Sequence, residues 1–181
     1  SAWLNWITVW QTWSWADYIC DWIDDNIQIQ DAINAINTAW GGIISIMEWV
    51  YVISGRMTPK SNVTIIGAGK WATTLIWWVV WDWMFYNNTA ISNFSIKDIT
   101  LDCNSTATGW LLWLNKITNW FFYNVEFKNV ASGGWHAVVG IATVATAIDC
   151  FNNTFENCIF DTHSGGLEML LLMNAETTKV I

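Results

Sequence analysis

Beyond residue 42, the hydrophobic residues fall in short runs that are rich in β-branched side chains and are separated by Gly, Asn and Asp. Runs of this kind, bounded by turn-forming residues, are typical of short β-strands. The runs are GIISIM, VYVIS, NVTIIGAG, NFSIKDITLD, WFFYNVEFKN and NTFENCIFD. An earlier run, Ile7–Val9, has the same character. The pattern therefore predicts a protein built mainly of short strands.

One segment has the periodicity of a helix instead. Residues Asp24–Ala39 place Ile29, Ile33 and Ile36 on one apolar stripe, at i, i+4 and i+7. Asp24 or Asp25 can accept hydrogen bonds from the first free amides of this helix. The glycines of Trp40–Gly42 can end it. We predict no other helix.

Three of the predicted strand segments repeat one another at offsets of 26 and 33 residues. The copies are Ile96-x-x-Ile99-x-Leu101, Phe122-x-x-Val125-x-Phe127 and Phe155-x-x-Cys158-x-Phe160. Before each middle apolar position stands Asp98, Asn124 or Asn157. Asx residues tolerate the left-handed conformation, and a repeat of this length indicates stacked supersecondary units. We predict a parallel β-solenoid with three internal apolar ladders; the alternative is a β-sandwich with coincidental spacing.

The N-terminal blocks also resemble a known family. ADYICDWIDDNIQIQDAINAIN, WGGIISIMEWVYVISG and SNVTIIGAGKWATTLI are similar to the opening of pectate-lyase-like proteins of the pectin lyase superfamily. The resemblance covers roughly residues 16–181. It implies an all-β fold, a right-handed single-stranded parallel β-helix with an N-terminal capping α-helix. Residues 1–42 would be the first strand and the cap, and residues 43–181 the coils, with a truncated C-terminus.

Composition narrows the class of protein. With 54% hydrophobic and 12% charged residues, the 181-residue chain can bury a core and is not disordered. A total of 7 Lys and Arg against 15 Asp and Glu excludes the basic footprint of a nucleic-acid-binding protein. The longest apolar stretches, Leu75–Trp81 and His136–Ile148, fall short of the ~18 residues that a membrane-spanning helix needs. Because the chain begins with Ser and shows no signal peptide, we expect a mature or partial form.

The chain contains 17 Trp but only 11 Gly, and several Trp stand where the family pattern has Gly. The clearest cases are Trp22, Trp40, Trp49, Trp71 and Trp135. Glycine adopts positive φ without strain, whereas a bulky L-residue there loses about 1–2 kcal/mol. Since some bacterial lineages read the codon UGA as glycine and others as tryptophan, we hypothesise that these are recoded glycines. The alternative is genuine tryptophan that fills the core or stacks on sugars.

Two acidic residues, Asp102 and Asp161, follow the third ladder position of their repeats, with Lys128 at the equivalent place between them. If the coils stack, these three side chains lie close together on the outer face. Two carboxylates at a suitable separation can act as acid and base on a glycosidic bond. A nearby ammonium lowers the pKa of a carboxyl group, which suits a salt-bridge ladder better than a general acid. The ladder is therefore the better fit, with catalysis as the alternative.

Two histidines and a glutamate form a second candidate group. His136 and His163 lie 27 residues apart, about one coil, whereas aligning the two SGG triplets stacks His136 on Glu168 instead. Histidine transfers protons near neutral pH. His136 and His163 are therefore candidate catalytic residues, together with Glu168, which would stack beside His136. The segment GGWH resembles the Gly-x-Gly-His of polygalacturonase-like hydrolases if Trp135 is read as Gly, but the paired Asp-Asp of that family is missing here. The alternative is that His136 is a loop residue.

Metal-ligand patterns are weak. Zinc is not expected, because the sequence has no Cys-x-x-Cys or His-x-x-x-His spacing. Calcium, which lyases of this superfamily often use, prefers six or more oxygen ligands. The carboxylates Asp98, Asp102, Asp149 and Asp161 are scattered singly. We expect no cofactor, with calcium as the weak alternative.

The sequence thus predicts a secreted or cell-surface β-helix that binds a polysaccharide, and leaves open whether it also cleaves it as a lyase or glycoside hydrolase. The candidate catalytic residues are Asp102, His136, Asp161, His163 and Glu168. The alternative is a structural or adhesion module, such as a tailspike-like or cell-surface stalk, because the superfamily also includes non-catalytic proteins. We expect no nucleic-acid partner. The oligomeric state stays open, with a homotrimer among the alternatives.

Overall fold

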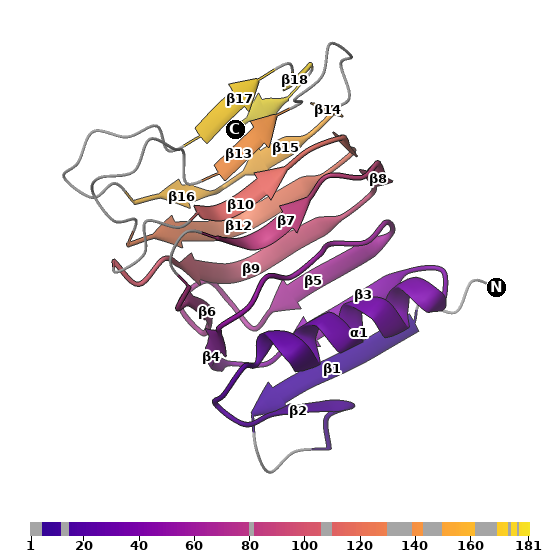
Figure 1. Ribbon diagram of the computed structural model, residues 1–181, viewed down its shortest axis with the longest axis vertical. Helices are drawn as coiled ribbons and strands as arrows, with labels where there is room; N and C mark the ends of the chain where they lie inside the picture. The colour runs from indigo at the N-terminus through magenta and orange to yellow at the C-terminus, as the bar shows by residue number, and fades with distance from the viewer. Residues whose placement is uncertain are drawn as a thin grey trace.

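The computed structural model describes residues 5–11, 15–79, 82–105, 110–129, 139–142, 150–161, 170–173, 175–176 and 178–181. Within these ranges the chain forms one α-helix and a series of short strands, and the strand pairings are parallel (Figure 1). Parallel pairing disagrees with a sandwich of antiparallel sheets. No helix among these residues is long and apolar enough to cross a membrane.

The largest sheet stacks strands from successive turns of the chain. Its main path is β2 (Tyr18–Cys20), β1 (Asn5–Gln11), β3 (Gly42–Ile46), β5 (Val63–Gly67), β9 (Ser95–Asp102), β12 (Phe121–Lys128), β15 (Thr154–Glu156) and β19 (Lys179–Val180). The second halves of β9 and β12 join a shorter row with β4 (Trp49–Ile53), β6 (Thr73–Trp77) and β16 (Ile159–Phe160). In the described residues, the sheet stays open at both ends.

Two four-stranded sheets complete the stack. One contains β7 (Trp83–Asn87), β10 (Trp110–Leu114), β13 (Val139–Ala142) and β17 (Leu170–Met173). The other contains β8 (Ile91–Ser92), β11 (Ile117–Thr118), β14 (Cys150–Phe151) and β18 (Ala175–Glu176). From β7 onward the chain visits the three sheets in the same order on successive turns, which produces the layered ribbon of Figure 1.

The predicted apolar ladders are present. Strand register aligns Ile96 with Phe122 and Phe155, Ile99 with Val125, and Leu101 with Phe127 and Phe160. The rings of Phe122 and Phe155 stack with centroids 4.5 Å apart, and those of Phe127 and Phe160 with centroids 4.9 Å apart. Cys158 packs half-buried against the same core, as an apolar filler should. The period of the repeat therefore predicted the core correctly.

Left-handed Asx corners separate the two strands of each repeat. Asp98, Asn124 and Asn157 have φ of 52°, 53° and 53°. The Nδ2 of Asn124 donates to Oδ1 of Asp98 (2.7 Å), and that of Asn157 to Oδ1 of Asn124 (3.2 Å). A second hydrogen-bonded column, which the repeat did not reveal, runs through Asn62, Asn93, Asn119 and Asn152.

The helix α1 (Asn26–Thr38) lies within the predicted segment and packs against the first strands of the stack. Its buried residues are Ile29, Ala32, Ile33 and Ile36, so the predicted stripe is confirmed. Asp25 is the N-cap residue, one of the two predicted alternatives, but the predicted hydrogen bond is wrong, because its side chain makes no capping bond. The buried Asp25 carboxylate instead accepts hydrogen bonds from Gln11 Nε2 and from the amides of Asp21, Trp22 and Val52. It thereby ties the start of the helix to β1 and β4.

Three tryptophans have a backbone conformation that favours glycine: φ is 75° at Trp22, 71° at Trp40 and 79° at Trp71. Trp40 follows the helix in a Schellman arrangement, in which its amide donates to Asn37 O and the amide of Gly41 donates to Ile36 O. Trp71 precedes the residue that closes a turn back onto Gly69, the place where a type II turn requires positive φ.

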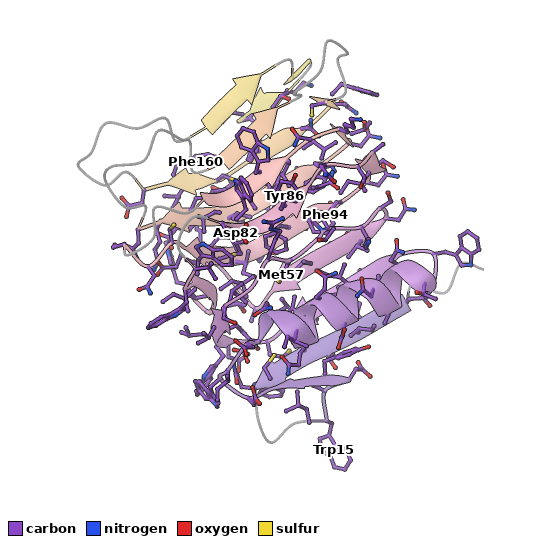
Figure 2. The ribbon with its side chains drawn as sticks, viewed as in Figure 1. Trp15, Met57, Asp82, Tyr86, Phe94 and Phe160 are labelled. Atoms are coloured by element: carbon purple, nitrogen blue, oxygen red, sulfur yellow. The ribbon has the colours of Figure 1, made fainter. Side chains whose placement is uncertain are left out.

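The remaining tryptophans behave differently. Trp49 begins β4 rather than occupying a left-handed turn, so the expectation of a glycine turn is wrong there, and Trp135 lies outside the described residues. Trp77 and Trp120 are buried in the core, as the alternative of core filling predicts. The left-handed Trp40 and Trp71 are 92% and 69% exposed. Trp15 also projects away from the body of the protein (Figure 2).

Asp25→Ala should lower the free energy of unfolding by about 2–4 kcal/mol, because four buried or half-buried donors lose their acceptor. Urea unfolding followed by circular dichroism measures the change. Asp31→Ala, on the exposed side of α1, is the control and should change stability by less than about 0.5 kcal/mol. Equal losses in the two variants would contradict the role assigned to Asp25.

Trp40→Gly should raise the free energy of unfolding by about 1 kcal/mol, because glycine removes the strain of the left-handed position. Trp77→Gly is the control: it empties a buried site and should cost about 3–5 kcal/mol. Thermal unfolding of both variants tests the comparison. A Trp40→Gly variant as unstable as Trp77→Gly would refute it.

Candidate functional site

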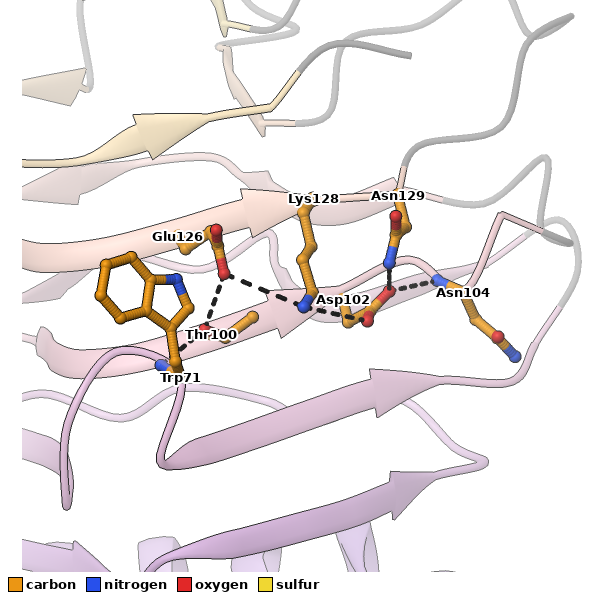
Figure 3. A network of polar contacts seen from close by, with 7 residues as sticks. All are labelled: Trp71, Thr100, Asp102, Asn104, Glu126, Lys128 and Asn129. Carbon is orange, nitrogen blue, oxygen red and sulfur yellow. Dashed lines mark hydrogen bonds and ion pairs between the residues drawn. The ribbon is translucent and has the colours of Figure 1, made fainter.

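A polar network lies on the outer face where β9 and β12 end (Figure 3). Strand register pairs Thr100 with Glu126 and Asp102 with Lys128. Because side chains alternate along a strand, residues two apart in β9 and in β12 point to the same face. The four side chains therefore converge, as the stacked-coil hypothesis predicted for Asp102 and Lys128.

Asp102 is held on both of its carboxylate oxygens. Oδ1 accepts hydrogen bonds from the amide of Asn104 and from Nδ2 of Asn129, both at 2.8 Å. Oδ2 lies 3.7 Å from Nζ of Lys128. The Asp102 side chain is only 10% exposed. These contacts make Asp102 better suited to positioning a neighbour than to exchanging protons with a substrate.

Lys128 bridges two carboxylates. Its Nζ lies 3.9 Å from Oε2 of Glu126, in addition to its contact with Asp102. Oε2 of Glu126 also accepts a hydrogen bond from Thr100 Oγ1 (3.0 Å), which in turn accepts one from the Trp71 amide (3.2 Å). Sequence reasoning missed Glu126, although its position two residues before Lys128 in one strand was a signal for a shared face.

Asp161 stands at the next layer of the same column. Its amide donates to Phe127 O (2.8 Å), which continues the pairing of β16 with β12 to the position of Lys128. Its side chain is exposed, and no hydrogen bond or ion pair to its carboxylate occurs within the described residues. Asp161 is therefore the acid of this column that is most open to solvent.

The second predicted group, His136, His163 and Glu168, lies outside the described residues, as does Asp149. Its two proposed registers stay predictions. Among the residues that the structure describes, no three His, Cys, Asp or Glu side chains gather as a metal site would require. Burial raises the pKa of the Cys158 thiol, which disfavours the thiolate needed for nucleophilic chemistry.

The site therefore offers an ammonium, two restrained carboxylates and one exposed carboxylate on an open sheet face. An ammonium can pair with a substrate carboxylate, and an exposed carboxylate can accept a proton within hydrogen-bond reach. The mutual pairing of Asp102, Lys128 and Glu126 equally fits the predicted salt-bridge ladder. The geometry is therefore compatible both with a catalytic column and with a structural salt-bridge ladder.

Comparison with curated proteins finds mannuronan C5-epimerases among the relatives of this chain. No family model matches the chain. Mannuronan C5-epimerase AlgE5 of Azotobacter vinelandii is 34% identical over 114 residues, which covers 54% of this chain and 11% of that protein. AlgE6 of the same organism is 31% identical over 114 residues and covers 54% and 12%. The chain thus spans about a tenth of the length of the curated relatives it matches.

Solved structures agree on the fold. The A-module of mannuronan C-5 epimerase AlgE4 of Azotobacter vinelandii matches 78% of this chain and 48% of that module, with a TM-score of 0.56 and 22% identity. The AlgE6 A-module matches 85% and 56%, with a TM-score of 0.50 and 17% identity. The resemblance drawn from the N-terminal blocks is confirmed: the chain is similar in sequence to mannuronan C5-epimerases, and its fold is similar to that of their A-modules, which are parallel β-helix proteins of the pectin lyase-like fold.

Proposed function

We propose that this chain is part of a carbohydrate-active protein that binds an acidic polysaccharide of the mannuronan type and inverts its uronate units at C5. The observation that carries the proposal is the 34% identity to a mannuronan C5-epimerase over 114 residues. The open polar column at the ends of β9 and β12 supports it, because that column has the groups such a reaction requires. This replaces cleavage as the leading reaction, with lyase or hydrolase activity as the alternatives.

Inversion at C5 needs two proton transfers. A base removes the proton from C5, the negative charge spreads into the adjacent carboxylate, and a proton returns to C5 from the opposite face of the ring. A cation beside the carboxylate stabilises the charge that develops there. No bond other than C5–H breaks, so atoms and electrons balance without a co-reactant. If the C4–O bond breaks instead of C5 regaining a proton, the same carbanion gives the product of a lyase.

The described residues fit these roles unequally. We assign the substrate carboxylate to Lys128, whose side chain is 28% exposed. Asp161 is the proposed base, because its carboxylate is exposed in the layer next to Lys128. Asp102 and Glu126 are positioning residues that hold the ammonium from the other side. His163, two residues after Asp161 in the sequence, is the proposed second proton-transfer group.

The handedness of the solenoid and the capping role of α1 are also part of this proposal. The strand order and the homologues support a right-handed solenoid, and the contacts of α1 with the first five strands support its role as a cap over the N-terminal end. Residues 1–42 would then form the capping segment and residues 43–181 the coils. A polymer substrate favours action outside the cell or at its surface.

Incubation with polymannuronate in D₂O tests the reaction. Inversion should place deuterium from the solvent at C5 and produce guluronate signals in the proton NMR spectrum, without chain shortening. Unsaturated ends would indicate a lyase, new reducing ends alone a hydrolase, and either result would refute epimerisation.

Asp161→Asn should lower the rate of deuterium incorporation by about 10²–10⁴-fold, because the proposed base is lost. Lys128→Met should lower it as well, since the substrate carboxylate loses its counter-charge. Asp31→Asn, on the outer side of α1, is the matched control and should leave the rate unchanged. An Asp161→Asn variant with the unaltered rate would refute the assignment.

A structural or adhesion module is the second candidate, and one observation favours it. Lys128 is paired with Asp102 and Glu126, so the column is a salt-bridge ladder that needs no substrate. Binding of polymannuronate without any incorporation of deuterium would select this candidate.

We also propose that Trp22, Trp40 and Trp71 stand where the gene is meant to encode glycine. Their positive φ supports recoding, because other non-Gly residues with positive φ in the described chain are Asn, Asp, Ser and Lys. The coding DNA tests the idea: TGA is expected at these three positions. TGG codons there would refute it.

A further inference from the structure

A hollow of about 400 Å³ opens on the sheet formed by β8, β11 and β14. Its lining residues are Ala90, Ile91, Ser92, Lys116, Thr118 and Phe151. In Figure 1, β8 and β14 lie at the right edge of the stack, whereas β16, which precedes Asp161, lies at the left. The hollow is therefore separate from the polar column described above.

The lining combines the groups that recognise a charged sugar. Strand register places Ser92, Thr118 and Phe151 in one row across three strands. Phe151 is 45% exposed and presents an apolar ring, while Ser92 and Thr118 carry hydroxyls that can donate and accept hydrogen bonds. Lys116 adds an exposed ammonium at the rim. Ligand sites are typically concave and apolar with a few polar groups placed to fix orientation.

Lys116, which lines the hollow, also has an unusual backbone conformation. Its φ is 55°, a conformation that favours Gly, Asn or Asp. The corner is fixed by the amide of Ile91, which donates to Lys116 O (3.1 Å), and by Nδ2 of Asn87, which donates to Asn115 O (2.7 Å). Most other non-Gly residues with positive φ in the described chain are Asn or Asp, and Lys116 is the cationic exception. The local hydrogen bonds explain the left-handed corner but not the choice of lysine, so a lysine at this position points to a function of its side chain.

The charge of Lys116 is available for a ligand. Within the described part of the chain, no carboxylate lies within salt-bridge distance of its ammonium. This contrasts with Lys128, which two carboxylates hold. The chain as a whole carries a net charge of −8, so an unengaged cation beside a hollow gives local attraction for an anion that the rest of the surface repels.

We propose that this hollow is a second binding site, which holds one carboxylate-bearing saccharide unit away from the reaction site. Phe151 packs against the sugar ring, Ser92 and Thr118 bond its hydroxyls, and Lys116 pairs with its carboxylate. The identity of the polymer rests on the proposed function, whereas the preference for an anionic sugar rests on the hollow alone. Such a site would keep an acidic polysaccharide attached to the protein between reaction events.

Titration of the full chain with tetramannuronate, followed by calorimetry and by amide NMR shifts, tests the proposal. Lys116→Asn should weaken binding at this site about tenfold, because a charge-assisted bond is lost, while its melting temperature stays equal or rises, since Asn suits the left-handed corner better. Lys116→Arg keeps the charge and is the matched control, with affinity within about twofold of the original. Neutral mannotetraose should bind at least about tenfold more weakly.

Three results would overturn the proposal: unchanged affinity in Lys116→Asn, equal affinity for mannotetraose, or shift changes that avoid Ser92, Thr118 and Phe151. The Asp161→Asn variant separates this site from the proposed function. Localised binding at the hollow in that variant, with no epimerisation in the unaltered chain, would refute the proposed function and leave the site standing. Epimerisation without binding at the hollow would refute the second site and leave the proposed function standing.

Discussion

The whole structure depends on one constraint: each turn of the chain must bend at the same place as the turn beneath it. The column Asp98, Asn124 and Asn157 meets this constraint with three left-handed corners that hydrogen-bond to one another. Asx residues occupy this conformation at little cost, and each side-chain bond offsets the cost of the next corner. Because the corners are aligned, the strands on either side stay in register and Phe122 can stack on Phe155.

Register in the core also determines what meets on the surface. A slip of one residue in a strand would move its apolar side chains to the outer face, so burial of Phe127 fixes the outward direction of Glu126 and Lys128 on either side of it. Asp102 then meets Lys128 because Leu101 pairs with Phe127. The polar column is thus a consequence of the ladders, and it would exist with or without a substrate. Asp161 is the last described member of the column, and within the described residues its exposed carboxylate takes no part in the ladder.

The sequence predicted those features that repeat along it. Spacing of two and three residues identified the ladders and one Asx column, since the same pattern recurs in three coils. Asn93 and Asn119 belong to the other column but escaped notice, because one asparagine between strands has no pattern of its own. Asp25 was misassigned for a different reason: a capping residue looks the same in sequence whether its carboxylate faces the helix or, as here, the amide of Val52 and the side chain of Gln11. The partners of the Asp25 carboxylate come from segments distant in the sequence, which the local pattern cannot reveal.

The three tryptophans with positive φ also lie at places where the chain turns. Trp40 occupies the glycine position of a helix terminus, Trp71 that of a tight turn, and Trp22 lies beside the Asx turn in which Asp21 accepts from the amide of Ile23. These local motifs differ, so no single packing or binding requirement would place an indole at all three. Lys116 differs from them in its charge, because it places an exposed ammonium beside a hollow that Ser92, Thr118 and Phe151 also line. A positive φ at a lysine whose charge suits the neighbouring hollow supports the proposed binding site, whereas positive φ at tryptophans in three unrelated turns supports the proposed recoding of glycine.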